Sequence, residues 1–280
     1  MLIATWNVNS IRTRLPQVID WINEFNPEVL CLQETKVEDS LFPLEAFESN
    51  GYQVSFSGQK SYNGVAIINK GQIKDIRIGF IGELSNDKEA ISLSDQKRLI
   101  SGLFDGVRIV NVYVPNGSNL SSEKYLYKLK WLNCLKRYLE AQASRGEPVC
   151  ILGDFNIAPE DKDIHTPERL KGSLMASEKE RTALKNVLGG NFEDVFRVFE
   201  QETGHWSWWD YRTHAWERNK GWRIDQIYLS QELLINAKNC QIHKKVRGNL
   251  QPSDHAPVIT EINWPPVSFD NDIDDYPLEL

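Results

Sequence analysis

Short apolar runs bounded by glycine, proline and polar residues recur along the chain, and they predict buried strands. The run at residues 149–152 lies between Pro148 and Gly153, so it is too short for a helix and is expected to form a strand buried on both faces. Asp105-Gly106 separates two such runs in the manner of a tight hairpin. The other strands are predicted at residues 2–7, 29–33, 52–56, 64–68, 73–78, 99–104, 107–114, 222–229 and 256–263.

Helical spacing of apolar residues appears in other segments. It predicts helices over residues 12–25, where Asn26 ends the helix, over residues 122–140, and over about 177–188, where the first turn carries a capping-box pattern. Two sheets of mixed strands, packed face to face with helices outside, would bury the apolar runs on both sides. The pattern therefore predicts a four-layer αββα sandwich.

Polar side chains gather where the predicted strands end. Asp154 and Asn156 follow the central run, and taken alone this pair is typical of an ordinary turn. Similar clusters occur at four further strand ends, at Thr5-Trp6-Asn7, Leu32-Gln33-Glu34, Arg223-Ile224-Asp225 and Ser253-Asp254-His255. Loops at one rim of a sheet are where an active site gathers its groups, so five such clusters predict a catalytic site.

Some of these residues are candidate metal ligands. Asn7, Glu34 and Asp254 offer amide and carboxylate oxygens, which suit a hard cation such as Mg²⁺, with Mn²⁺ as a substitute. The sequence lacks the thiolate and multi-histidine sets that zinc prefers.

The remaining cluster residues predict acid–base chemistry. Asp154, steadied by Asn156, is the candidate base for a water molecule. Asp225 is expected to accept from one nitrogen of His255 and to favour the charged ring, whose other nitrogen can meet an anionic centre. A nucleophilic triad is the competing interpretation, but the sequence has no GxSxG elbow. The ensemble predicts metal-assisted hydrolysis of a phosphate ester.

The net charge of the chain does not favour the binding of nucleic acid. The chain has 32 Lys and Arg against 39 Asp and Glu, a formal net charge of −7, so nucleic-acid binding requires a local basic patch and a bound cation. Lys124 and Lys128 lie one turn apart in the predicted helix 122–140 and are expected to face the same way. A solvated helix face is the alternative, but the nearby loop of Asn116 favours phosphate contacts.

Length and composition permit one large domain. The 280 residues, 41% of them hydrophobic, predict a single domain over residues 1–264 and an acidic, proline-broken tail over residues 265–280. Four cysteines without CxxC spacing predict reduced thiols and a cytoplasmic setting. Separately, we expect a monomer, since no obligate protein partner is evident from the sequence. The N-terminal sequence supports neither a signal peptide nor a membrane span.

Eight segments form an ordered set of motifs: TWNVNSIR, LCLQETK, NGVAI, NVYVPNGS, ILGDFNIAPED, SWWDYR, NKGWRID and PSDHAPV. Together they resemble the endonuclease/exonuclease/phosphatase superfamily, most closely its bacterial exonuclease III and AP endonuclease branch. The resemblance covers about residues 2–262. It implies that Glu34 and Asn7 lie at the metal and that Asp254 belongs to the metal or phosphate shell. Asn9 stands where some relatives carry an acid, so arrangements with one and with two metal ions stay open.

The resemblance also implies roles in catalysis and recognition. Tyr113 and Asn156 are implied to contact the scissile phosphate, Asp154 to activate water, and Asp225 to orient His255. The implied pocket for a flipped abasic sugar consists of Trp208, Trp222 and Ile224. The alternative for these indole rings is that they fill the core between the sheets.

Three functions compete at this stage. The first is a Mg²⁺-dependent repair nuclease that cuts duplex DNA 5′ of abasic sites and also acts on 3′ ends as a 3′-to-5′ exonuclease and a 3′-phosphatase or phosphodiesterase. The second is an enzyme of the same fold that acts on a lipid or sugar phosphate, which would not need the basic helix or the Trp-rich segment. The third is a catalytically silent nucleic-acid-binding module, which is disfavoured because each proposed chemical position holds a competent residue.

Overall fold

Two six-stranded sheets form the centre of the computed structural model, which describes residues 1–265. The first sheet contains, in spatial order, β11 (Ala237–Ile242), β12 (Val258–Ile262), β1 (Leu2–Asn7), β2 (Val29–Gln33), β4 (Val65–Asn69) and β3 (Gln53–Ser57). The second contains β5 (Ile73–Ile78), β6 (Leu99–Phe104), β7 (Val107–Tyr113), β8 (Val149–Asp154), β10 (Asp225–Ser230) and β9 (Phe192–Asp194).

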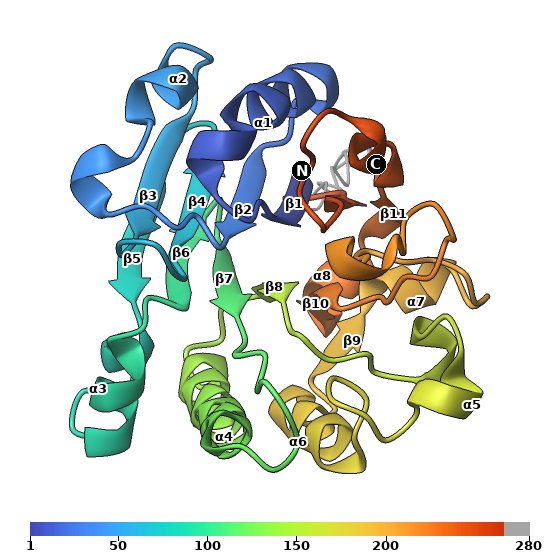
Figure 1. The fold of residues 1–280 in the computed structure, drawn as a ribbon. Helices are drawn as coiled ribbons and strands as arrows, with labels where there is room; N and C mark the ends of the chain where they lie inside the picture. Colours follow the sequence, from blue (N-terminus) through green and yellow to red (C-terminus); the bar gives the residue numbers. More distant parts are fainter. Residues whose placement is uncertain (266–280) are drawn as a thin grey trace, which may run out of the picture.

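The helices are α1 (Ile11–Phe25), α2 (Leu44–Glu48), α3 (Lys88–Ser94), α4 (Glu123–Ala143), α5 (Pro167–Leu170), α6 (Glu178–Leu188), α7 (Val195–Phe199) and α8 (Gln231–Leu234). The longest of them cover the outer faces of the sheets, whereas α7 and α8 contribute side chains to the apolar cluster between the sheets. Figure 1 shows α1 and α2 beyond the first sheet and α4 and α6 beyond the second. The αββα sandwich predicted from the sequence is confirmed.

The core is divided into layers by the two sheets. Cys150 and Leu152 of β8 belong to the apolar cluster between the sheets, whereas Ile151 belongs to the cluster under α4. A third cluster joins α1 to the outer face of the first sheet. Successive side chains of a strand point to opposite faces, so a strand buried on both faces needs an unbroken apolar run. This explains why the run at residues 149–152 was recognisable from the sequence.

Local signals placed most element ends correctly. Helix α1 ends at Asn26, which has the left-handed conformation of a C-cap, and α6 begins with the capping box of Ser177 and Glu180. Asp105 and Gly106 both have positive φ, as a two-residue hairpin turn requires. The strand predicted from residue 222 begins only at Asp225.

The edge strands β9 and β11 and several short helices were not predicted. Strand β11 exposes polar residues along much of its length, and only Cys240 is buried. Such a strand has no apolar run to mark it. Nearly all of the predicted tail at 265–280 lies outside the described residues, and within residues 1–265 no helix has the length and apolar character needed to span a membrane.

Strand directions bring the polar clusters to one rim. Strands β1 and β2 are parallel, as are β7 and β8, whereas β12 and β10 run antiparallel to their neighbours. The ends of the first four strands therefore meet the starts of the last two. In the second sheet the strand register places Asp154 directly beside two other site residues. It pairs with Tyr113 on one side and with Asp225 on the other.

We expect Gly153→Ala to destabilise the protein by about 2–4 kcal/mol. Gly153 has a φ of +149°, and a Cβ atom there would lie 1.9 Å from the backbone oxygen of Val112. Gly146→Ala is the control, because Gly146 has a φ of +71° and no atom within 4 Å of the added Cβ. That change should cost about 1 kcal/mol. Urea unfolding measures both, and equal losses would contradict the clash.

Candidate active site

The carboxylate of Asp154 lies at the centre of the rim. It is 1% exposed, and its Oδ2 accepts hydrogen bonds from Nδ2 of Asn7 (2.9 Å) and Nδ2 of Asn156 (3.0 Å). The backbone nitrogen of Asn156 donates to Oδ1 at 2.9 Å. Two asparagines therefore fix the orientation of a carboxylate that the fold has removed from water.

His255 lies between two acids. Its Nδ1 is 2.9 Å from Oδ2 of Asp225, and its Nε2 is 3.9 Å from Oδ2 of Asp154. Ser207 holds Asp225 in place, because its hydroxyl donates to Oδ2 at 2.6 Å and accepts from the backbone nitrogen of Asp225. The predicted Asp225–His255 contact is present, and the second nitrogen of the ring faces the candidate base.

The charges of these groups are strongly coupled. Burial lowers the pKa of His255, but the negative charges of Asp225 and Asp154 outweigh burial and raise this pKa to about 10. Burial raises the pKa of Asp154 to about 7, against the opposing charge of His255 and with help from Asp225 and Glu34. A protonated ring therefore faces a carboxyl group whose pKa lies near neutrality, where a general base is most effective.

Glu34 completes an acidic cluster that can hold a metal ion. One ligand atom each from Glu34, Asp154 and His255 lie within 4.8 Å of one another. The protonated His255 is no ligand, so the carboxylates remain, and oxygen donors suit a hard cation. Asn7 presents Nδ2 to Glu34 at 2.8 Å, while its Oδ1 accepts from the backbone nitrogen of Asn9. In this arrangement Asn7 links the acids through nitrogen and turns its candidate ligand oxygen away from them.

Asp254 is not one of the three residues of this cluster, and its predicted place at the metal or the phosphate stays a prediction. Its two carboxylate oxygens accept from Nδ2 of Asn9 (2.8 Å) and Nε1 of Trp208 (2.9 Å). Burial raises its pKa, but the charge of His255 and the bonds from Asn9 and Trp208 lower it more, for a net decrease. Asp254 therefore anchors an indole ring beside the site.

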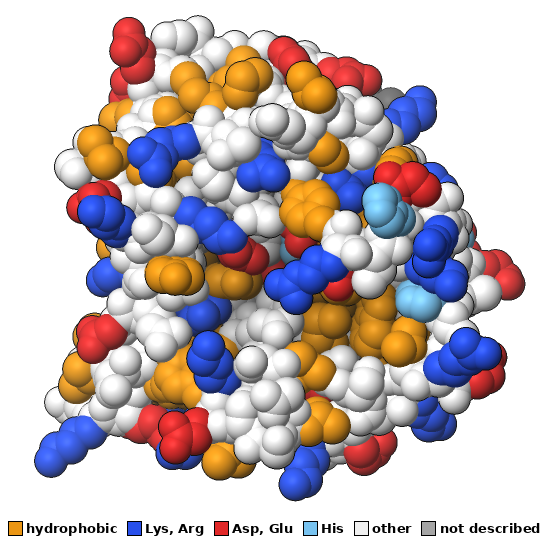
Figure 2. All heavy atoms as spheres, viewed as in Figure 1, with side chains coloured by type: hydrophobic (Ala, Val, Ile, Leu, Met, Phe, Trp, Pro, Cys, Tyr) orange, Lys and Arg blue, Asp and Glu red, His pale blue; other side chains and the backbone are white. Residues whose placement is uncertain are grey.

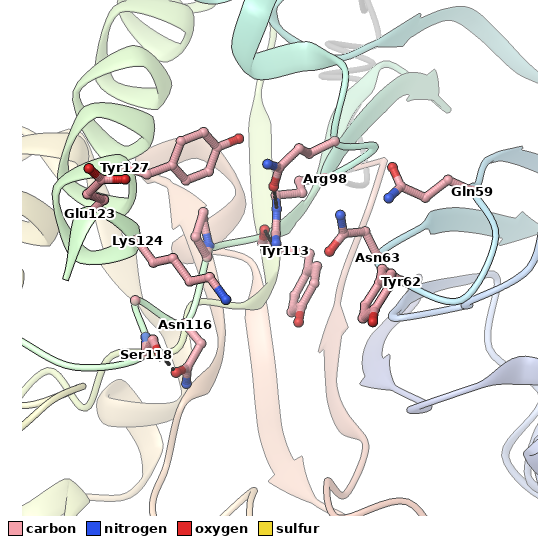
Figure 3. A pocket seen from close by; sticks show the side chains of 13 residues that line it. Gln59, Tyr62, Asn63, Arg98, Tyr113, Asn116, Ser118, Glu123, Lys124 and Tyr127 are labelled. Atoms are coloured by element: carbon pink, nitrogen blue, oxygen red, sulfur yellow. Dashed lines mark hydrogen bonds between the residues drawn. The ribbon is translucent and has the colours of Figure 1, made fainter.

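Tyr113 and Asn116 extend the rim on the side of the second sheet. Nδ2 of Asn116 donates to Oδ1 of Asn156 at 2.9 Å. Burial, followed by the charge of Glu34, raises the pKa of Tyr113, so its hydroxyl stays protonated as a donor. Arg98 lies 4.5 Å from the centre of the Tyr113 ring. These residues line a cavity of about 750 Å³, into which Lys124 also extends (Figure 3).

Lys128 does not share a solvent-facing surface with Lys124, so the predicted pair of phosphate-binding lysines is wrong for this residue. Lys124 is exposed, whereas the side chain of Lys128 is completely buried and forms an ion pair with Glu180. The side chains of α4 project around the helix, and Lys128 falls on the face that packs against α6. Helical spacing alone could not reveal a buried acid from another helix.

A second cavity lies on the other side of the rim. Its volume is about 350 Å³, and Trp208 and Trp222 are among its walls. Ile224 does not line it; this side chain is 1% exposed and belongs to the apolar cluster that also contains Trp222. The structure thus places two of the three predicted pocket residues at a cavity and the third in the packing behind it.

Other residues of the site had not been singled out from the sequence. They include Lys36, whose Nζ lies 2.8 Å from Oε2 of Glu34, and Ser207, which holds Asp225. Both lie within motifs already noted, so proximity to those motifs was a usable signal. Arg98 had no such signal, because its place over Tyr113 depends on strand pairing.

Positive side chains surround the hollow that these groups form. Figure 2 shows Lys and Arg side chains distributed over this face, with acidic and apolar side chains recessed between them. The formal net charge of −7 therefore does not describe this face. A locally basic rim around an acidic centre suits a polyanionic substrate together with a bound cation.

Comparisons with known proteins give close relatives. Residues 4–255 match the model of the Endonuclease/Exonuclease/phosphatase family. Exodeoxyribonuclease III of Haemophilus influenzae is 33% identical over 269 residues, which cover 93% of this chain and 99% of that one. The solved 3′ phosphatase NExo from Neisseria, bound to a product DNA hairpin, is 37% identical with a TM-score of 0.88, over 94% and 100% of the two chains. An AP endonuclease from Archaeoglobus fulgidus is 38% identical with a TM-score of 0.87, over 94% and 99%.

We expect Asp225→Asn to lower the pKa of His255. The wild-type ring should titrate near pH 10, and removal of the Asp225 charge takes away the main stabilisation of the protonated form. A decrease of about one unit or more is expected. NMR titration of the imidazoles in metal-free protein measures it, and His165 is the internal control in the same spectra. An unchanged His255 titration would mean that Asp225 does not hold the charge on the ring.

Proposed function

The chain belongs to the Endonuclease/Exonuclease/phosphatase family, and on that premise we propose that it is a metal-dependent phosphodiesterase of DNA repair. The proposed activities are incision 5′ of abasic sites in duplex DNA, 3′-to-5′ exonuclease activity and removal of phosphate from 3′ ends. The similar proteins named exodeoxyribonuclease III, 3′ phosphatase and AP endonuclease support this range. They also favour DNA over a lipid or sugar phosphate.

One observation carries the proposal: the buried carboxylate of Asp154 lies 3.9 Å from Nε2 of His255, whose Nδ1 is paired with Asp225. In the proposed reaction Asp154 takes a proton from the attacking water. His255 stays protonated and stabilises the negative charge on phosphorus-bound oxygen. Tyr113, Asn116 and Asn156 orient the phosphate. Without DNA the Asn156 amide donates to Asp154 and to the Val114 carbonyl, and Asn116 donates to Asn156, so the phosphate would take over some of these bonds. A protein that only binds nucleic acid would not need a base next to a cationic ring.

We propose Mg²⁺ as the metal, held by Glu34 with Asp154 close by. The acid cluster supports this, because carboxylate oxygens suit Mg²⁺ or Mn²⁺. When bound, the metal would neutralise charge on the phosphate and on the leaving oxygen. Asn7 fixes the positions of Glu34 and Asp154 relative to each other, because its Nδ2 donates a hydrogen bond to each carboxylate.

The cavity lined by Trp208 and Trp222 is proposed to receive the abasic sugar. The ring of Trp208, one of its walls, lies 6.4 Å from the ring of His255, and rigid indole walls suit a flat apolar sugar face. A nucleotide without a base costs less to rotate out of the duplex, because its stacking and pairing are already lost. Lys124 remains a proposed phosphate contact in the other cavity, the one that Tyr113 and Asn116 line.

The wider setting of the protein is proposed on the same basis. A single domain over residues 1–264 acting as a monomer remains our interpretation. The four cysteines are free, which supports the cytoplasmic setting expected from the sequence.

The function is tested with a duplex that carries one abasic analogue. We expect incision 5′ of the analogue, loss of activity with EDTA, and recovery with added Mg²⁺. Asp154→Asn keeps the shape of the side chain but removes the proton acceptor, so turnover should fall by about 10²-fold or more. Products are separated on a denaturing gel. Wild-type protein that leaves the duplex intact under all these conditions, while it hydrolyses a lipid or sugar phosphate, would favour the second hypothesis.

Trp208→Ser tests the sugar cavity. Trp208 is partly exposed at the cavity, so this change should leave the melting temperature nearly unchanged and reduce the preference for abasic over intact duplex. Trp209→Ser is the matched control. Trp209 is 0% exposed, and its loss should destabilise by about 3–5 kcal/mol without altering the preference. If the two variants behave alike, Trp208 is a structural residue.

A further inference from the structure

Lys128 is a charged side chain buried beneath the candidate phosphate site. Neither its side chain nor that of Glu180 has any exposed surface. Its Nζ donates to the backbone oxygen of Asn156 at 2.7 Å, to the backbone oxygen of Asn116 at 3.2 Å, and to Oε1 of Glu180. An ammonium group has three N–H donors, so each one has an acceptor.

The three acceptors come from three separate segments. Asn116 lies between β7 and α4, Asn156 follows β8, and Glu180 is in the first turn of α6. One buried ammonium group therefore fixes the backbones of both asparagines. Their side chains meet above it, where Asn116 donates to Asn156 and Asn156 donates to Asp154. Figure 3 shows Asn116 at the edge of the cavity beside Tyr113.

The loop of Asn156 depends on such external bonds. Asn156 has a φ of +51°, in the left-handed region, which asparagine adopts more readily than other residues with a side chain. The loop is therefore a tight turn whose carbonyl groups must find partners outside it. The ammonium group of Lys128 is such a partner for the Asn156 carbonyl.

A purely structural ion pair between α4 and α6 is the alternative. Such a pair would not require the two loop carbonyls, and a buried pair adds little stability, because desolvation offsets the attraction. Burial lowers the pKa of Lys128, and the charge of Glu180 opposes this. Apolar replacements would also remove the donor to the carbonyls of Asn116 and Asn156 and the acceptor for the backbone nitrogens of Met175 and Ser177. If Lys128 serves to fix one arrangement of the two loops, its hydrogen bonds to the carbonyls of Asn116 and Asn156 are explained.

We propose that Lys128 is a positioning residue: it holds Asn116 and Asn156 so that their amides meet the scissile phosphate in a fixed geometry. This inference rests on the proposed function. Lys128 touches neither the substrate nor the reacting atoms, so it acts through the two asparagines. A misplacement of about 1 Å in such donors can cost 10²-fold in rate.

The test compares wild type with Lys128→Met/Glu180→Gln. This double change removes both charges together, so neither is left unpaired in the core, and it retains side chains of similar volume. We expect kcat on an abasic duplex to fall by about 10- to 100-fold while KM stays within about twofold, measured well below each melting temperature. A merely structural role would lower the melting temperature but leave kcat of the folded enzyme unchanged.

The control is Lys136→Met on the same helix. Lys136 forms an exposed pair with Glu140, and loss of such a pair has little effect on stability. Its kinetics should match those of wild type. A drop in kcat equal to that of the double variant would overturn the inference, since it would mean that any charge loss on α4 suffices.

A double-mutant cycle identifies the route of the effect. If Lys128 acts through the amides, the double change should lower kcat much less in an Asn156→Ala background than in wild type. Full additivity, or an unchanged kcat in the first comparison, overturns the inference.

A separate readout distinguishes this inference from the proposed function. The side-chain amide signals of Asn116 and Asn156 are followed by NMR in the metal-free, DNA-free protein. We expect these signals to shift and to exchange faster with solvent in Lys128→Met/Glu180→Gln than in wild type. Unchanged signals overturn the positioning role even if wild type is active. Inactive wild type with altered signals would instead remove the proposed function.

Discussion

The removal of one carboxylate from water is the constraint on which the candidate site depends. Asp154 is 1% exposed, and a buried charge is costly unless it is paired and hydrogen-bonded. The first sheet supplies Asn7, the loop after β8 supplies Asn156, and the segment before β12 supplies His255. Because these groups come from both sheets, the site exists only once the sheets have packed together. Its chemistry and its fold are therefore inseparable.

A buried charge cluster gives the indole-lined cavity a rigid support. Nε of Arg223 donates to Asp163 at 2.6 Å, and its Nη2 donates to Asp194 at 2.7 Å. These bonds join the loop after β8 to the segment that carries Trp222 and leads into β10. In a medium of low dielectric such bonds are strong, so a paired network rigidifies its surroundings. The fold thus fixes the segment that carries one wall of the cavity.

Local patterns in the sequence determined the fold class and the chemical groups. The strand at residues 149–152 was identifiable because burial on both faces demands an unbroken apolar run, and the Asp105-Gly106 turn because both residues must have positive φ. Asp154, Asn156 and His255 were identifiable because each stands where a predicted strand meets a loop, and Asp225 because it belongs to a polar cluster within one of the recognised motifs. Edge strand β11 left no such pattern, since it buries little of its surface.

Tertiary structure alone decided the contacts of each side chain. Helical spacing placed Lys124 and Lys128 on one face, yet only the position of α6 decides that one lysine reaches solvent and the other meets Glu180. The sequence likewise did not show that Asn9 and Trp208 would donate to the two carboxylate oxygens of Asp254. The physical reason is the range of the interactions. Periodicity and turn chemistry act between residues close in the chain, whereas a buried charge is satisfied by whichever partner the packing brings to it. Glu180 is 52 residues from Lys128, and Asn9 is 245 residues from Asp254.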